Sequence, residues 1–245
     1  MIALLSDIHA NSQALDACLR HARDRGADQY VFLGDFVGYG ADAVSVVERV
    51  SNFAASGAVV IKGNHDDAIE NTASYFNDAA QAALQWARET LSLEQKQFLA
   101  SLPMMIRDQR ACYVHASAAA PDRWDYIDSH SAARRCVEAA ATSYTFCGHV
   151  HDQTLYFETS RGLMSEFRPS AGTPIPVRSH RRWLAIVGSV GQPRDRNPAA
   201  AYTLFDPVRE EITFYRVMYD AMAAAEKIRK CGLPASLAFR VELGI

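Results

Sequence analysis

Five short groups of residues that commonly bind metal ions follow one another along the sequence. They are Asp7-Ile8-His9, Gly34-Asp35, Gly63-Asn64-His65-Asp66, His115 and Gly148-His149-Val150-His151. An apolar run of the kind that forms a buried strand precedes each group. Carboxylate oxygen, amide oxygen and imidazole nitrogen together suit transition-metal ions. The residue types and their order predict a metal-dependent hydrolase.

The individual groups suggest separate roles. Asp35 follows an apolar strand, where a charged residue needs a partner or a cation. Its carboxylate has two oxygens and is the natural group to bridge two ions. Asn64 offers a neutral carbonyl oxygen as a ligand. His65 is the candidate proton donor, and Asp66 is expected to hold the tautomer of the His65 ring.

The two paired groups raise a question of geometry. Asp7 and His9 can point into one cleft only where the strand gives way to a loop. His149 and His151 are expected on the same side of an extended segment, so that each imidazole can reach a different ion. His115 ends its own strand and completes the set.

A parallel sheet can bring these groups together. We expect strands at 2–6, 30–34, 58–62, 111–115 and 144–148, separated by helices near 11–25, 41–55 and 131–141. This alternation favours parallel strands with right-handed crossovers. Ligands of open α/β sheets bind outside the carboxyl ends of the strands. The five groups should therefore meet in one pocket.

Two other parts of the chain differ from this alternation. Residues 67–103 predict a helical insertion, with helices near 75–91 and 93–101, that could cover the cleft as a lid or pad the sheet. Past His151, short turns separate strands at 153–157, 183–187, 201–205 and 211–217, which suggests an antiparallel second sheet. Asp220 then caps a closing helix to about residue 231.

Composition excludes several classes of protein. With 25 basic and 28 acidic residues the formal charge is −3, which argues against nucleic acid and membrane surfaces as partners. No apolar run reaches the roughly 18 residues of a membrane span. Asp7 interrupts the first apolar run before a signal-peptide core could form, so we expect a cytoplasmic protein. The five cysteines contain no CxxC pair, which disfavours a structural zinc site.

The five groups resemble the motifs of the calcineurin-like metallophosphoesterase superfamily, namely D-x-H, G-D, G-N-H-D/E, H and G-H-x-H. The segment from Gly188 to Asp195 resembles a bacterial subgroup of small phosphodiesterase-like members. The resemblance implies an α/β fold, a four-layer αββα sandwich of two mixed β-sheets flanked by helices. Residues 1–245 would then form a single metallophosphoesterase domain.

The resemblance also implies a binuclear site. One ion would be held by Asp7, His9, Asp35 and His151, and the other by Asp35, Asn64, His115 and His149. His65, with Asp66 behind it, would donate a proton to the leaving group or stabilise its charge. The mixed N/O ligand set favours Mn, Fe, Zn, Co or Ni over Ca. A hydroxide bridging the two ions would attack phosphorus.

Two departures from the family pattern bear on the substrate. Tyr39 stands where the protein Ser/Thr phosphatases of the superfamily have the Arg of Asp-Arg-Gly, which argues against a phosphoprotein substrate and against symmetric cleavage of dinucleoside tetraphosphates. Ala116 stands where relatives often have Gly after the metal-binding His. Candidate substrate contacts are Arg123, Trp124 and Tyr126 in the loop after His115, together with Gln192 and Arg194.

The favoured function is a two-metal phosphohydrolase that cleaves small phosphodiesters or nucleotides. An asymmetric dinucleoside polyphosphate hydrolase is the first alternative, and a nuclease is disfavoured by the absence of a basic stripe. A metal-binding scaffold without catalytic activity is the alternative from another class. Retention of His65 and of every predicted ligand argues against it.

Overall fold

The computed structural model describes residues 1–72 and 76–245. Its strands are β1 (Ile2–Leu5), β2 (Gln29–Phe32), β3 (Val59–Val60), β4 (Met105–Arg107), β5 (Ala111–Val114), β6 (Tyr144–Cys147), β7 (Thr154–Glu158), β8 (Met164–Phe167), β9 (Ile175–Pro176), β10 (Trp183–Ile186), β11 (Ala200–Asp206) and β12 (Glu211–Val217). Its helices are α1 (Ser12–Asp24), α2 (Ala43–Ala55), α3 (Asn64–Asp67), α4 (Asp78–Thr90), α5 (Leu93–Ser101), α6 (His130–Ala140), α7 (Ala221–Lys230) and α8 (Ala235–Leu243), with a 3-10 turn at Pro121–Arg123.

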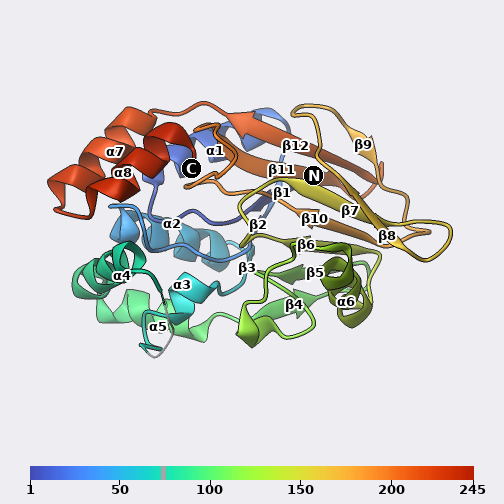
Figure 1. Cartoon of the computed structure of the whole chain (residues 1–245), viewed down its shortest axis with the longest axis horizontal. Coiled ribbons are helices and arrows are strands. Elements are labelled where there is room, and N and C mark those ends of the chain that lie inside the picture. Colours follow the sequence, from blue (N-terminus) through green and yellow to red (C-terminus); the bar gives the residue numbers. More distant parts are fainter. Residues whose placement is uncertain (73–75) are drawn as a thin grey trace.

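The strands form two mixed sheets. The first has the order β3-β2-β1-β11-β12-β9 and the second has the order β4-β5-β6-β10-β7-β8. β1, β2 and β3 are parallel, as are β5, β6 and β10, whereas β11 pairs antiparallel with β1 and β7 pairs antiparallel with β10. The prediction of an antiparallel second sheet from the second half of the chain is therefore wrong, because both halves contribute strands to both sheets. The mixed sandwich itself is confirmed (Figure 1).

Three apolar clusters separate the four layers. Side chains alternate along β1, so that Ala3 and Leu5 pack with α1 and α2 while Leu4 faces the other sheet. The layer between the sheets is rich in aromatic residues, including Phe146 and Phe205. A third cluster packs α6 onto the outer face of the second sheet. Burial on both faces explains why the central strands are apolar throughout.

Several helix ends follow the sequence signals. The Asn11 side chain accepts a hydrogen bond from the Ala14 amide at the start of α1, and Ser92 and Gln95 form the expected capping box of α5. The helix predicted from residue 75 begins at Asp78 in the described chain, and residue 75 itself lies outside the described residues. α8 was not predicted, because Gly232 and Pro234 mark the end of α7 without indicating a new helix.

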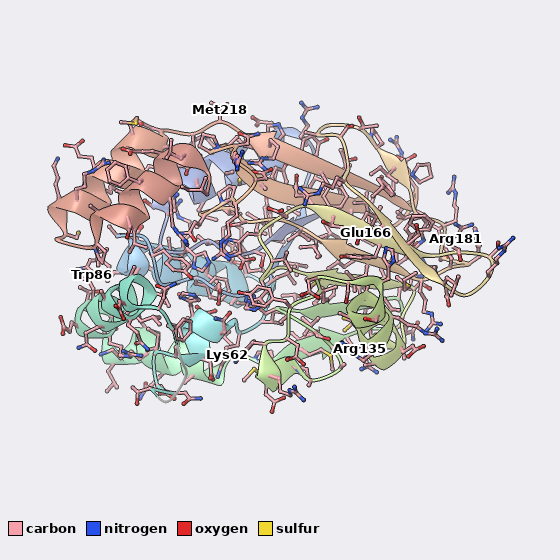
Figure 2. All side chains as sticks on the ribbon, in the orientation of Figure 1. Lys62, Trp86, Arg135, Glu166, Arg181 and Met218 are labelled. Carbon is pink, nitrogen blue, oxygen red and sulfur yellow. The ribbon has the colours of Figure 1, made fainter. Side chains whose placement is uncertain are left out.

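The insertion packs against the body of the protein. α4 and α5 bury Leu84 and Leu99 in the same cluster as Val46 of α2. The Lys62 amide donates to the Pro103 carbonyl, and Lys62 Nζ donates to the Ala100 carbonyl at 2.9 Å. Figure 2 labels Lys62, and Trp86 on α4. The described part of the insertion therefore pads the outer side of α2, and whether it moves as a lid stays a prediction.

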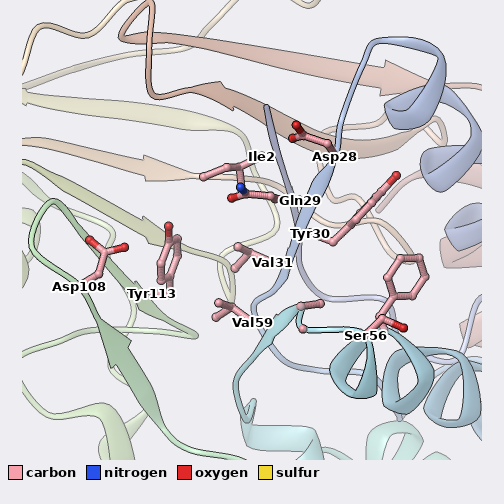
Figure 3. Close-up of a pocket in the computed structure, with 12 residues that line it drawn as sticks. Ile2, Asp28, Gln29, Tyr30, Val31, Ser56, Val59, Asp108 and Tyr113 are labelled. Atoms are coloured by element: carbon pink, nitrogen blue, oxygen red, sulfur yellow. The ribbon is translucent and has the colours of Figure 1, made fainter.

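A cavity of about 470 Å³ lies at the amino ends of the strands (Figure 3). Tyr30, Val31 and Val59 from the first sheet line it, with Asp108 and Tyr113 on the side of the second sheet. Its lining includes no histidine. The residues that could do chemistry lie at the opposite edge, where the parallel strands end. No helix in residues 1–72 and 76–245 is both long and apolar enough to cross a bilayer.

Candidate metal centre

The predicted ligands occupy sharp bends that follow the parallel strands. Asp7, His9, Asp35, His149 and His151 all have positive φ, between 48° and 73°. This left-handed backbone is uncommon for residues other than glycine and tends to mark functional sites. The expectation that His149 and His151 lie on an extended segment is therefore wrong. The left-handed bends, and not a straight strand, allow neighbouring side chains to enter one pocket.

Asp7, His9 and His151 form the first cluster. His151 Nε2 lies 3.1 Å from Asp7 Oδ1 and 3.2 Å from His9 Nε2. All three side chains are buried, and their ligand atoms lie within 4.8 Å of one another. Two imidazole nitrogens and a carboxylate oxygen in this space form a suitable site for one divalent ion.

The second cluster is built around His115. Its Nε2 lies 3.1 Å from Asn64 Oδ1, 3.2 Å from His149 Nδ1 and 3.4 Å from Asp35 Oδ2. These atoms come from four separate segments, which follow β2, β3, β5 and β6. Figure 1 shows how the two sheets bring these strand ends to one edge of the sandwich.

One carboxylate oxygen lies near a histidine of each cluster. Asp35 Oδ2 lies 3.4 Å from His115 Nε2 and 3.7 Å from His9 Nε2. Its other oxygen, Oδ1, accepts a hydrogen bond of 2.8 Å from the His65 amide. The orientation of this carboxylate is thus fixed from the protein side, and Oδ2 faces the space between the two clusters.

Backbone carbonyls set the tautomers of three histidines. Nδ1 of His9, His115 and His151 faces the carbonyl oxygens of Val37, Leu33 and Gln192, at 3.1, 2.7 and 2.5 Å. Because a carbonyl can only accept, each Nδ1 carries a proton, and Nε2 is the atom that each ring turns toward the cluster. His149 uses the opposite atom, Nδ1, toward His115. These donors fit divalent cations well, with the outer support that metal-binding histidines usually have.

The electrostatics of the pocket also suit cations. Burial lowers the pKa of His149 to about 3 and of His65 to about 4, and it lowers the pKa of His9 well below its usual value. These rings are therefore neutral near pH 7, which is the form that binds metals. Burial also opposes protonation of His115, but the Asp35 charge outweighs it and raises the His115 pKa to about 9. The negative charge of Asp35 thus attracts a cation to the shared position.

The His65 ring lies beside the first cluster. Its centroid is 4.8 Å from that of His9, 4.6 Å from that of Tyr39 and 4.8 Å from that of Phe76. Its Nδ1 is buried and has no hydrogen-bond partner among the described residues. A Cβ on Gly38, which has φ +83°, would collide with this nitrogen, so the glycine makes room for the ring.

Asp66 contacts backbone and not the His65 ring. Its Oδ2 accepts from the amides of Asp35 (2.8 Å) and Gly63 (2.9 Å), and its Oδ1 accepts from the Phe36 amide (2.8 Å). Burial, and then the like charge of Asp35, raise its pKa to about 7. The expectation that Asp66 holds the tautomer of His65 is not met in this geometry. Asp66 instead joins the loops after β2 and β3 and is a positioning residue for Asp35.

We expect Asp66→Asn to lower the free energy of unfolding by about 1–3 kcal/mol. The carboxylate oxygens accept hydrogen bonds from backbone N–H groups, and in the variant an NH₂ donor would face one of these N–H donors. Metal affinity should fall about 10–100-fold, as for other residues that support a ligand from behind. Denaturant unfolding and metal titration measure the two effects. Asp67→Asn makes the same change at the next residue and should leave both near wild type. Equal behaviour of the two variants would contradict the positioning role.

The segment after β10 closes the back of the first cluster. Ser189 Oγ donates to the Asp7 carbonyl at 2.8 Å, and the Val190 amide donates to the Ser6 carbonyl. The same segment supplies the Gln192 carbonyl that faces His151. The sequence of this segment shows its resemblance to a family subgroup. The backbone contacts that it makes with Ser6, Asp7 and His151 are seen only in the structure.

A pocket of about 280 Å³ opens beside the two clusters. Of the five candidate substrate contacts, Tyr126 and Arg194 line it. Tyr126 stacks on His149 with ring centroids 4.2 Å apart. Arg123 lies outside this lining and pairs with Asp125 at the surface, whereas Trp124 packs its ring 5.9 Å from that of His115.

Phe76, Asn77 and Ala80 also line the pocket, although no sequence motif marks them as site residues. They lie at the start of α4, more than ten residues after the nearest predicted ligand. Asn77 carries a signal of another kind, because its side chain caps α4 by accepting from the Ala80 amide at 3.0 Å. Only the packing of the insertion beside His65 brings these residues to the site.

Comparison with known proteins gives a consistent result. Residues 1–209 match the calcineurin-like phosphoesterase superfamily domain. The crystal structure of a metallophosphoesterase from Sphaerobacter thermophilus is 35% identical, with a TM-score of 0.88, and covers 100% of this chain and 98% of that chain. The uncharacterized protein MJ0912 of Methanocaldococcus jannaschii is 33% identical over 100% of this chain and 98% of its own length. A hypothetical protein of Pyrococcus horikoshii, PH1004, shares the fold, at 22% identity and a TM-score of 0.80 over 100% of this chain and 99% of that chain.

The family match spans the motif region and the strands that carry the clustered ligands. The chain therefore belongs to the calcineurin-like phosphoesterase superfamily and is a metal-dependent phosphoesterase.

Proposed function

We propose that the protein hydrolyses small phosphodiesters or nucleotides at a centre of two divalent ions that share Asp35. The observation that carries this proposal is the position of Asp35 Oδ2, 3.4 Å from His115 Nε2 in one cluster and 3.7 Å from His9 Nε2 in the other. A single carboxylate oxygen between two sets of imidazoles is the arrangement expected of a bridging ligand.

Two groups of residues would hold the ions. Asp7, His9, Asp35 and His151 would bind one, and Asp35, Asn64, His115 and His149 would bind the other. Bound divalent ions supply Lewis acidity, which neutralises phosphoryl oxygens and makes water a nucleophile near neutral pH. The buried carbonyls behind the histidines hold the rings in place before substrate arrives.

His65 is the proposed partner of the leaving group. Its low pKa, which follows from burial, keeps the ring neutral near pH 7. A neutral ring stabilises the departing oxygen by donating a hydrogen bond from its N–H as negative charge develops there. The position of His65 in the lining of the pocket beside the two clusters supports this role.

Pocket size and surface composition support a small substrate. The volume of about 280 Å³ is at the lower limit of typical ligand pockets. Tyr126 is 52% exposed while one face covers His149, so its outer face can stack on a flat leaving group or a base. A dinucleoside polyphosphate would place one base there and extend out of the pocket, which is the alternative substrate class.

The test is a panel of metals and substrates on protein stripped of metal. We expect no turnover without metal, and hydrolysis of bis(p-nitrophenyl) phosphate after one of Mn, Fe, Zn, Co or Ni is added. Diadenosine tetraphosphate, assayed in parallel, separates the two substrate classes by kcat/KM. Absence of turnover with every metal would overturn the proposed hydrolysis and favour a binding scaffold.

Metal removal should also lower thermal stability. An ion present at 100 times its Kd stabilises the folded state by about 2.7 kcal/mol. In a chain of this size each kcal/mol moves Tm by roughly 2–4 °C. The stripped protein should therefore melt roughly 5–10 °C lower in calorimetry, and added metal should restore the difference. A Tm that does not respond to metal would contradict a bound ion at this site.

A further inference from the structure

Arg194 lines the pocket beside the metal centre. Among the lining residues in the described chain it is the one with a permanent positive charge. The lining also includes the aromatic side chains of Phe76 and Tyr126. An anionic ligand in this pocket would therefore lie in the same cavity as the Arg194 side chain.

The guanidinium of Arg194 has unused hydrogen-bond donors. Its Nη2 donates to Gln192 Oε1 over a long 3.4 Å, and its buried Nε has no acceptor in residues 1–72 and 76–245. Arg194 also forms no salt bridge within those residues, because the adjacent Asp195 pairs with Arg216 instead. A half-buried guanidinium without a carboxylate partner is costly unless a ligand completes its bonding.

Arg194 is close to the catalytic end of the pocket. Burial raises the pKa of the Tyr39 phenol, and the Arg194 charge is the largest influence in the opposite direction. The Tyr39 ring in turn lies 4.5 Å from the His9 ring and 4.6 Å from the His65 ring, measured between centroids. Tyr39 thus contacts two residues of the proposed centre, and it lines the same pocket as Arg194.

The backbone on either side of Arg194 is fixed. Before it, Gln192 is fully buried, its amide donates to Ser189 Oγ at 2.8 Å, and its carbonyl faces His151. After it, the Arg196 amide donates to the Gly244 carbonyl at 2.7 Å. Because these contacts restrain both sides, little conformational freedom should be lost when Arg194 binds an anion.

We propose that Arg194 binds phosphoryl oxygens of the substrate and is the residue that sets the affinity of the pocket for phosphate esters, with Gln192 as its positioning residue. This inference rests on the proposed function. A guanidinium presents parallel N–H donors that match a phosphate group in two bonds. The oxygens it binds belong either to the phosphate that is cleaved or to a neighbouring phosphate of the same substrate.

Arg194→Gln tests the proposal. Because the contact exists in both the bound and the reacting substrate, KM for bis(p-nitrophenyl) phosphate should rise about 10–100-fold with kcat nearly unchanged. The Kd of inorganic phosphate for the metal-loaded protein, measured by calorimetry, should weaken by a similar factor. Metal content by elemental analysis should stay at the wild-type value. Arg194→Lys keeps the positive charge but lacks the paired N–H donors of the guanidinium, so its KM and phosphate Kd should lie between those of wild type and Arg194→Gln.

Arg196→Gln is the matched control, since it removes the same charge two residues away from an exposed side chain outside the pocket lining. It should match wild type in KM and in phosphate Kd. An equal rise in KM for bis(p-nitrophenyl) phosphate and diadenosine tetraphosphate supports contact with the cleaved phosphate. A rise for the tetraphosphate alone supports contact with a neighbouring phosphate.

The outcomes separate this inference from the proposed function. If wild type is active but Arg194→Gln keeps the wild-type KM for both substrates and the wild-type phosphate Kd, the role of Arg194 is wrong while hydrolysis stands. If wild type is inactive with every metal, the proposed function is wrong, and the phosphate Kd still decides the inference. Weaker phosphate binding in Arg194→Gln than in Arg196→Gln would then support it, and equal binding would overturn it.

Discussion

Asp35→Asn is expected to reduce kcat/KM by at least about 1,000-fold. The substitution removes the negative charge from the oxygen shared by the two clusters. Lewis-acid stabilisation by bound metal is worth several kcal/mol, and each 1.36 kcal/mol is a tenfold change in rate. The variant should also bind metal more weakly, because an amide is a poorer ligand than a carboxylate for these ions. Steady-state kinetics and elemental analysis after dialysis measure the two effects.

The control for this change is Asp24→Asn, an exposed position at the end of α1. It makes the same chemical substitution far from the clusters and should preserve both activity and metal content. Asp35→Asn protein that retains the wild-type metal content and activity would show that Asp35 does not bridge. Such a result would leave the structural clusters without the function assigned to them.

His65→Ala is expected to lower kcat by about 100-fold or more while the ions stay bound. The His65 ring contacts the His9 ring. Neither of its nitrogens takes part in the close contacts of His115 with Asn64 and His149, or of His151 with His9. Loss of the ring therefore removes the donor that faces the leaving oxygen and leaves the proposed ligands in place. The loss should be smaller for substrates with better leaving groups, since these need less stabilisation as the bond breaks.

Comparison of p-nitrophenyl with alkyl esters measures that dependence. His130→Ala is the control, because His130 is an exposed residue of α6. Its Nε2 lies 3.9 Å from Oε2 of Glu166, which Figure 2 labels. It should behave as wild type in both assays. A His65→Ala enzyme with unchanged kcat, or with lost metal, would contradict the assigned role and point to His65 as a ligand near His9 and Asp35.

The positions of the seven predicted ligands followed from a simple rule. Polar residues that come directly after buried parallel strands lie at one edge of the sheets, whatever the separation along the chain. Asp7 and His115 are more than a hundred residues apart, yet both follow strands of the same orientation at the same edge. The strand positions were predicted from apolar runs to within two residues for β1, β2, β5 and β6.

Strand pairing could not be predicted in the same way. β11 lies beside β1, nearly two hundred residues earlier in the chain, with Ala3 opposite Leu204. Its sequence is apolar on both faces, as a strand buried in either sheet would be. Short turns indicate that neighbouring strands are antiparallel, but they do not tell which sheet receives the pair.

Contacts made by backbone were also hidden. The carbonyls of Val37 and Leu33 set the histidine tautomers, but every residue has a backbone carbonyl and residue type does not show which ones do so. Asp66 was assigned to His65 because the two are adjacent, whereas the short helix α3 turns its carboxylate back toward the Gly63 amide. Adjacent residues on a helix point in different directions, so sequence proximity was a poor guide there.

The metal content and metal positions of the loaded protein test the shared centre at Asp35. After saturation with Mn and removal of free metal, elemental analysis should give about two ions per chain. Anomalous diffraction should then place both ions beside Asp35, about 3.5–4 Å apart. A single ion, or two ions that do not both contact the Asp35 carboxylate, would contradict the shared centre.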